Sequence, residues 1–129
     1  MDRPFSKVYG GKAGNCIMYK VRQHLKNYQK YKAITKEQNR DYAVSTERYA
    51  STIRWYDLIR SVLESWRDTY PNDAEIVAEL YALGTHKTPM SAVNISVKHY
   101  VSSSTVYSIR HAFELEIAFR AIQNGLLRV

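Results

Sequence analysis

Short hydroxyl side chains and hydrogen-bonding rings are concentrated between residues 102 and 111, and no acidic residue interrupts this stretch. On a helix, residues three or four positions apart share a face, so the side away from the apolar positions would carry Ser103, Ser104, Tyr107, Ser108 and His111. Such side chains can hydrogen-bond to base edges in the major groove of DNA, where carboxylates would be repelled by phosphates. We therefore predict that these five residues read DNA bases. The alternative is an ordinary solvated helix face behind a Ser/Thr cap.

Four more residues are predicted to contact DNA outside the base edges. Ser102 would cap the helix and present the partial positive charge of the helix N-terminus to a phosphate. Lys87 and Lys98 would position the DNA backbone. Arg110 follows Val106 by one turn, so it lies at the border of the apolar stripe and could still reach a phosphate.

Two predicted helices must position these residues. Thr88 is expected to cap a short first helix with Pro89 as its first residue, and this helix would end near His99. Ser102 is expected to cap a second helix that ends near Gly125, and its inward stripe would be Val106, Ile109, Phe113, Ile117 and Ala121. Two helices with a short turn form the outline of a helix-turn-helix, which many αα-hairpins share without touching DNA.

The same residues resemble a known protein family. The run V-S-S-S-T-V at residues 101–106, with Arg110, Phe113 and the ending A-I-Q-N-G-L at residues 121–126, looks like the C-terminal part of small phage transcriptional regulators from Gram-positive hosts. These are the RinA/ArpU-like late-gene activators, whose C-terminal helix-turn-helix is similar to region 4 of sigma factors. The V-S-x-S-T-V core is common to many such modules, so it indicates a DNA-binding helix more than one family.

The resemblance covers only part of the chain. It extends upstream through Trp55, Trp66 and residues 76–77, and it fades in the first forty residues. His99 and Tyr100 depart from it, since many sigma-like modules have an aliphatic and a small residue before the turn. The resemblance implies an activator of phage late genes that binds double-stranded DNA and acts with RNA polymerase in the cytoplasm of a bacterial host cell.

Composition and charge agree with a folded, DNA-binding protein. The 129 residues fit a single domain, residues 1–129, and 45% of them are hydrophobic. The net charge is +7, and it is uneven: residues 1–40 hold ten Lys or Arg against two acids, residues 41–84 four against eight, and residues 85–129 five against two. The basic ends predict two surfaces that attract polyanions, and the acidic middle is predicted to serve packing or a protein partner.

Helical periodicity predicts an all-α protein of about four to five helices that ends in the helix-turn-helix. Residues 1–15 contain several glycines and are predicted to be a mobile basic arm, and residues 16–70 are predicted to form long helices. The helix-turn-helix module is predicted over residues 73–125, beginning with a supporting helix that Asn72 or Asp73 would cap.

The long helices have distinct faces. A basic amphipathic helix is expected from residue 16 to about residue 33. A second helix, capped by Ser45 or Thr46, is expected to reach Tyr70. The apolar face of this second helix is broad, so part of it is expected to pack against another copy, with a homodimer favoured because dimers suit paired DNA half-sites.

No catalytic, cofactor or metal pattern is recognisable. The four histidines are scattered, and Glu114 and Glu116 lie two positions apart, so they point in different directions on a helix. Cys16 is the single cysteine, which excludes a disulfide or a cysteine cluster within one chain. No apolar stretch approaches the roughly 20 residues that span a bilayer. We predict no enzyme activity, no cofactor, no metal and no membrane segment.

The sequence therefore predicts a sequence-specific regulator of transcription that binds double-stranded DNA and activates phage late genes. Two alternatives remain open. A small terminase subunit would combine a helix-turn-helix with oligomerising helices and would recognise phage packaging sites. A protein-interaction module would act on RNA polymerase or a repressor through its tyrosine-rich helix, without contacting DNA.

Overall fold

The computed structural model describes residues 11–37 and 47–128, and every regular element in these residues is an α-helix. The predicted all-α fold is confirmed to that extent. The described helices number six, slightly more than the four to five expected: α2 (Gly11–Lys26), α3 (Tyr28–Glu37), α5 (Glu47–Thr69), α6 (Pro71–Tyr81), α7 (Ala92–His99) and α8 (Ser103–Gln123).

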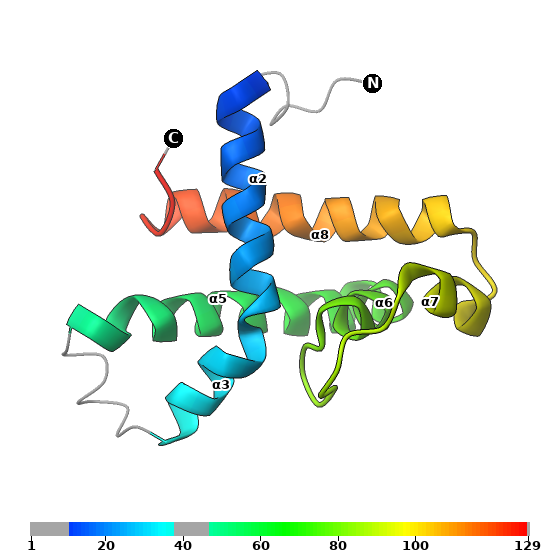
Figure 1. The fold of residues 1–129 in the computed structure, drawn as a ribbon, viewed down its shortest axis with the longest axis horizontal. Coiled ribbons are helices and arrows are strands. Elements are labelled where there is room, and N and C mark those ends of the chain that lie inside the picture. Colours follow the sequence, from blue (N-terminus) through cyan, green and yellow to red (C-terminus); the bar gives the residue numbers. More distant parts are fainter. Residues whose placement is uncertain (1–10, 38–46, 129) are drawn as a thin grey trace.

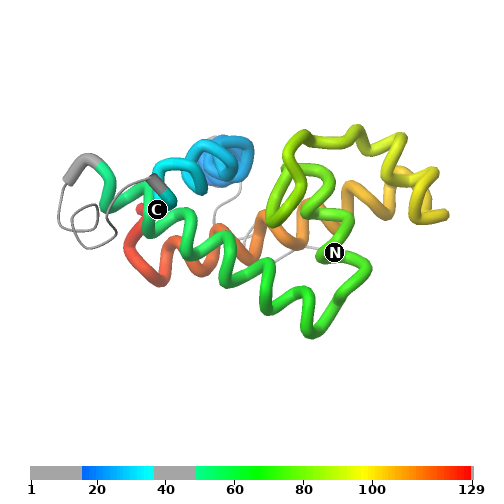
Figure 2. The backbone as a smooth tube through the Cα atoms, turned by 90° about the horizontal axis from the view of Figure 1, so that it is seen from below, coloured from blue at the N-terminus to red at the C-terminus, as the bar shows by residue number. Residues whose placement is uncertain are grey.

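The two longest helices, α5 and α8, pack against each other, and the remaining helices cross or flank them (Figure 1). α2 crosses α8, and α3 turns away from the end of α2 to pack on α5. At the other end of the pair, α6 folds back from α5 and leads through a loop to α7, which packs on both α6 and α8. Figure 2 shows α2 and α3 on the same side of the α5–α8 pair as α6 and α7.

The main core lies where α2, α5, α6 and α8 meet. The broad apolar face predicted for α5 is largely buried within the single chain, through Ile53, Trp55, Leu58, Ile59, Val62, Leu63 and Trp66. Only Tyr70, expected at the end of this stripe, is exposed. Because α3, α6 and α8 all pack on α5, the width of its apolar face is accounted for without a second copy. The width of the apolar face of α5 therefore no longer supports the predicted homodimer.

A smaller apolar cluster joins the three C-terminal helices. Ile76 of α6, Ile95 of α7 and Val106 of α8 are buried against one another. Ile95 is the one fully buried residue of α7, which has eight residues. A helix this short is marginal by itself in water, so its position depends on α6 and α8.

The N-terminal helices differ from their predicted bounds. α2 begins at Gly11, so residues 11–15 are helical rather than part of an arm, and residues 1–10 of the expected arm lie outside the described residues. The single helix expected over residues 16–33 is interrupted at Asn27, whose N–H is shared between the carbonyls three and four residues before it, at 3.2 and 3.1 Å. A shared donor tightens the turn, and the chain changes direction there (Figure 1).

The boundary between α5 and α6 is set by Pro71. Proline has no N–H and is favoured as the first helical residue, and α6 starts with it. Asn72 and Asp73 therefore lie inside the first turn instead of capping it, and the N-cap Tyr70 makes no side-chain hydrogen bond. The caps expected for α5, at residues 45 and 46, lie outside the described residues.

The loop after α6 is anchored by α3. α6 ends at Tyr81, and the chain then turns through two left-handed residues, Ala82 at φ 54° and Gly84 at φ 65°. Gln29 of α3 donates from Nε2 to the carbonyls of Ala82 and His86, each at 2.6 Å. Lys32, on the same helix, donates from Nζ to the carbonyl of Gly84 at 2.8 Å. These bonds fix the start of the α6–α7 loop.

α7 begins later than predicted. Its N-cap is Ser91, whose hydroxyl accepts a hydrogen bond from the N–H of Asn94 at 3.2 Å, and Thr88 and Pro89 lie in the preceding loop. The N–H of Met90 donates to the carbonyl of Glu79 at 2.8 Å, which holds this segment against α6. Thr88 and Ser91 both carry a hydroxyl that can cap a helix. The hydrogen bond from Met90 to Glu79 holds residues 88–90 as a loop, so that the helix starts after Ser91.

The predicted cap, the C-terminal glycine and the inward stripe of α8 are confirmed. Ser102 is its N-cap and accepts a hydrogen bond from the N–H of Thr105 at 3.1 Å. Gly125 is left-handed at φ 74°, two residues after the helix ends. The predicted inward stripe is fully buried except for Ile109, which is half-buried; the buried members are Val106, Phe113, Ile117 and Ala121.

Residues 100–102 connect α7 to α8. Tyr100 follows α7 in the left-handed conformation at φ 57°, and its side chain is 95% exposed. The left-handed region costs a residue with a Cβ about 1 kcal/mol, and an exposed ring gains little packing in return.

Replacing Tyr100 by glycine is expected to raise the free energy of unfolding by about 1 kcal/mol, because glycine adopts positive φ without a steric penalty. Urea unfolding followed by circular dichroism measures this change. Ala82→Gly is the matched comparison: Ala82 has a similar φ but is buried, so lost packing should cancel part of the gain. A destabilised Tyr100→Gly protein would contradict this account of the turn.

Candidate nucleic-acid interface

The N-terminal half of α8 presents a polar, accessible face. Ser103, Ser104 and Ser108 are exposed, Tyr107 is 49% exposed and His111 is half-buried. These are the five residues predicted to read bases, and none of them is sealed inside the protein. Since all five belong to one half of a single helix, the fold brings them onto a common surface.

Hydroxyl groups cluster at the start of α8. Besides capping the helix, Ser102 Oγ lies 3.0 Å from Ser104 Oγ and 2.8 Å from Thr105 Oγ1. All three side chains are exposed. The cluster therefore combines donors and acceptors with the positive end of the helix dipole.

The two acidic residues of α8 are engaged with other helices. Glu114 is fully buried: it accepts from Arg22 Nε of α2 at 3.2 and 3.3 Å and from the hydroxyl of Tyr81 of α6. Glu116 accepts from Trp66 Nε1 of α5 at 3.0 Å and lies 3.8 Å from Arg120 Nη2. Neither carboxylate belongs to the exposed face at residues 103–111.

Burial raises the pKa of Tyr81, and its hydrogen bond to Glu114 and the charge of that carboxylate raise it further. Tyr81 therefore remains a protonated donor across the physiological pH range. With Arg22 on the other side, Glu114 has partners from α2 and α6. A buried charge is costly unless it is paired and hydrogen-bonded, and this arrangement provides both.

Arg110 lies between the exposed face of α8 and the interior. Its guanidinium carbon lies 5.1 Å from the centre of the Tyr107 ring, and its Nε lies 3.7 Å from Glu114 Oε2, which is too long for a hydrogen bond. It borders a cavity of about 460 Å³ that is also lined by Arg22, Lys26 and Lys87. Arg110 and Lys87, both predicted to contact DNA, therefore line this cavity, and Arg110 also adjoins Tyr107.

Lys98 has a structural partner. Its Nζ donates to Glu79 Oε1 of α6 at 3.0 Å, and His99 Nε2 lies 2.9 Å from the same oxygen. Burial alone would raise the pKa of Glu79, but the hydrogen bonds from His99 and Lys98, together with the charges of these two residues, hold that pKa below its usual value of 4.5. These bonds fasten the C-terminal end of α7 to α6, while half of the Lys98 side chain stays exposed.

The structure thus divides the predicted DNA-contacting residues into three places. The common surface on α8 holds Ser102 and the five predicted base readers. Lys87 and Arg110 line the cavity, and Lys98 lies at the contact between α6 and α7.

Sequence reasoning missed the polar cluster around Glu114. Arg22 falls on the basic side of the amphipathic helix predicted from residue 16 to about residue 33, and Tyr81 falls among the apolar positions of the predicted supporting helix, so their spacing does not indicate a shared carboxylate. The signal that was present is the position of Glu114 directly after the buried Phe113 and one turn before the buried Ala118. A carboxylate at such a position requires a partner from another helix, although the sequence does not say which one.

Among the described helices, none is long and apolar enough to cross a membrane. In the same residues, no three metal-ligating side chains gather at one place. Comparisons with protein-family models, with curated proteins and with solved structures find no match to the chain.

Replacing Glu114 by glutamine is expected to lower the free energy of unfolding by about 1.5–3 kcal/mol, because it removes the charge from the hydrogen bonds with Arg22 and Tyr81 and buries an amide N–H₂ group in their place. Urea unfolding measures the loss. Glu116→Gln is the matched control: Glu116 is 37% exposed and a glutamine oxygen can still accept from Trp66, so about 1 kcal/mol or less should be lost. Equal losses in the two variants would contradict the central role of Glu114.

Acidification is expected to weaken the attachment of α7. Because the pKa of Glu79 is lower in the folded protein than the unfolded value of 4.5, its contribution to stability is complete above pH 4.5 and is lost as the pH falls through the folded pKa. The difference in melting temperature between wild type and Glu79→Gln should therefore shrink as the pH is lowered from 6 to 3. A difference that stays constant over this range would refute the ionised Glu79 contact.

Proposed function

We propose that this protein is a sequence-specific regulator of transcription that binds double-stranded DNA, with α7 and α8 as its helix-turn-helix and α8 as the recognition helix. The observation that carries the proposal is the distribution of polar groups on α8. Its face at residues 102–111 is accessible and carries no carboxylate, while its two acids contact α2, α5 and α6. A recognition helix must fit between two rows of phosphates, so carboxylates on that face would oppose binding.

The connection between α7 and α8 supports the same proposal. Three residues separate the two helices, which is the connection length of helix-turn-helix motifs. α6 packs on both α7 and α8, so it would serve as the supporting helix. Both ends of the turn are capped, by the left-handed Tyr100 and by the hydroxyl of Ser102. Such a turn holds the start of α8 in a fixed place.

The charge distribution favours a polyanionic partner. Lysines are exposed on α2 and α3, at Lys20, Lys26 and Lys30, and Lys87 is exposed in the α6–α7 loop. Each lysine that neutralises a phosphate releases counter-ions, so the affinity for DNA should fall steeply as salt rises.

The narrower part of the proposal rests on sequence resemblance. Residues 101–106 and 121–126 resemble the RinA/ArpU-like late-gene activators, and this likeness supports activation of phage late genes, together with RNA polymerase, in the cytoplasm of a bacterial host. No family model, curated protein or solved structure adds support to this narrower assignment.

A second candidate function, a protein-interaction module, is favoured by one observation on α7. Val93 and Val97 are spaced by four residues and are 64% and 70% exposed, and Tyr100, which follows the helix, is 95% exposed. Apolar side chains four residues apart form a stripe along one side of a helix. Such a stripe suits contact with another protein, and it could serve a DNA-binding regulator as well as a module that does not bind DNA.

Selection from a library of random duplexes is expected to enrich one sequence, and wild-type protein should bind it more tightly than a scrambled duplex. Ser108→Glu should weaken this binding by at least about tenfold, because it places a carboxylate beside the phosphates. Fluorescence anisotropy of the labelled duplex measures the dissociation constants at two salt concentrations.

Ser65→Glu is the matched control for this experiment. It introduces the same charge at an exposed serine of α5, so its effect on affinity should be small and should vanish at the higher salt concentration. The proposal fails if no sequence is enriched. It also fails if Ser108→Glu binds the selected duplex as tightly as Ser65→Glu does.

A further inference from the structure

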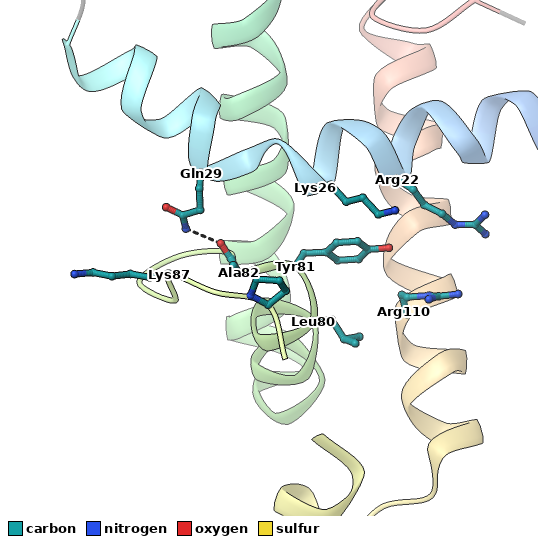
Figure 3. Close-up of a pocket in the computed structure, with 9 residues that line it drawn as sticks. Arg22, Lys26, Gln29, Leu80, Tyr81, Ala82, Lys87 and Arg110 are labelled. Carbon is teal, nitrogen blue, oxygen red and sulfur yellow. Dashed lines mark hydrogen bonds between the residues drawn. The ribbon is translucent and has the colours of Figure 1, made fainter. Parts of the chain in front are cut away.

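A cavity of about 460 Å³ separates the C-terminal half of α2 from α8 and the α6–α7 loop. Figure 3 shows its walls: Arg22 and Lys26 come from α2, Leu80 and Tyr81 from α6, and Arg110 from α8. Its volume lies within the range of sites that hold small molecules, which is roughly 300–1,000 Å³. None of the five predicted base readers lines it, although Arg110, which does, lies beside the ring of Tyr107.

The charges around the cavity are unbalanced. Four basic side chains line it, Arg22, Lys26, Lys87 and Arg110, and no carboxylate does so among the described residues. The nearest carboxylate whose contacts are known is Glu114, which is already bound to Arg22 and Tyr81. In Figure 3 the side chains of Arg22, Lys26 and Arg110 lie on one side of the cavity, and that of Lys87 extends away from them. Several basic side chains around one concave surface attract an anion.

One of these basic groups has an unmet hydrogen-bonding requirement. Arg110 Nε is buried, and no acceptor lies within hydrogen-bond distance of it. The nearest carboxylate oxygen recorded for this atom is Glu114 Oε2 at 3.7 Å, so the guanidinium of Arg110 keeps unused hydrogen-bonding capacity. Arginine is also the side chain best suited to phosphate, because its planar fork can bind two oxygens.

The remaining walls are mostly apolar or aromatic. Leu80, Pro89 and the ring of Tyr81 border the cavity, and Gln29, the one uncharged polar side chain among its lining residues apart from Tyr81, is already bonded to the α6–α7 loop. Phosphate alone would leave these walls without a partner, whereas a phosphorylated organic molecule could contact them with its apolar part. The side chains of Arg22 and Arg110 are only 37% and 34% exposed, so a DNA backbone phosphate, with bulky sugars on both sides, would reach the rim more easily than these two groups.

We propose that this cavity binds a small phosphorylated molecule. Arg110 and Lys26 hold the phosphate group, Arg22 adds its charge, and Leu80 and Pro89 contact the organic part. This site goes beyond the proposed binding of DNA, and it is argued from the cavity alone, although Arg110 and Lys87 of its lining are also among the residues predicted to contact DNA. The ligand class is a phosphomonoester with an apolar or aromatic portion.

Titration calorimetry of the full chain with adenosine 5′-monophosphate tests the proposal, with inorganic phosphate and uncharged adenosine as comparison probes. We expect saturable binding of the monophosphate, weaker binding of inorganic phosphate and no binding of adenosine. Lys26→Ala should weaken the monophosphate affinity by about tenfold or more, because it removes a charge-assisted hydrogen bond. Lys26 is exposed, so this variant should fold normally, and its melting temperature checks this.

Lys30→Ala is the matched control, since Lys30 is an exposed lysine of α3 that does not line the cavity. The proposal is overturned if the monophosphate does not bind, or if Lys30→Ala weakens its binding as much as Lys26→Ala does.

A competition experiment repeats the titration in the presence of random-sequence duplex DNA. If the duplex displaces the monophosphate and Lys26→Ala weakens both ligands equally, the phosphate belongs to the DNA backbone and the small-molecule site is wrong. Because the titration needs no DNA, failure of the proposed function would leave its result interpretable.

Discussion

The buried carboxylate of Glu114 is the constraint on which the arrangement of this protein depends. It lies in α8 but receives hydrogen bonds from α2 and α6, so a single ionised group fixes three helices relative to one another. Its burial would be prohibitive without these partners. The same contact has a consequence for the surface: it turns one of the two acids of α8 into the interior and leaves the exposed face at residues 102–111 without negative charge. Stability of the fold and the character of that face thus have a common origin.

The attachment of α7 is of a different kind. α7 is connected to the rest of the protein by one buried aliphatic residue, Ile95, and by polar contacts. In these contacts Lys98 and His99 bind the carboxylate of Glu79. Few apolar contacts imply that this helix opens locally more readily than α5 or α8 does. The exposed stripe of Val93 and Val97 shows that α7 has a side that residues 11–37 and 47–128 leave uncovered. A helix held in this way can adjust to a partner at a modest energetic cost.

Local sequence signals predicted those elements whose bounds depend on interactions between residues close together in the chain. The cap at Ser102, the inward stripe of α8 and the long α5 follow from periodicity and capping, which need no knowledge of the rest of the fold. The start of α7 could not be predicted in this way, because Ser91 and Thr88 are both suitable caps and the contact of Met90 with α6 is tertiary. The break at Asn27 was also missed, since the apolar positions keep their helical spacing through it.

The candidate site shows the same division. The accessibility of the polar residues near the start of α8 could be predicted from spacing alone. The cavity could not, since its basic residues come from positions 22, 26, 87 and 110 and meet only when α2 crosses α8. The helical spacing correctly predicts that Arg22 and Lys26 share the basic face of a helix. It does not show that this face borders a cavity.

Arg22 and Glu114 are 92 residues apart in the chain. During synthesis on the ribosome, α2 therefore emerges well before α8, and its contacts with α8 can form only after the intervening helices have been made. Contacts between such distant segments slow folding, because a large loop has to close first. The ion pair of Glu114, whose carboxylate joins three helices in the folded protein, is thus one of the contacts that cannot guide the earliest steps of folding.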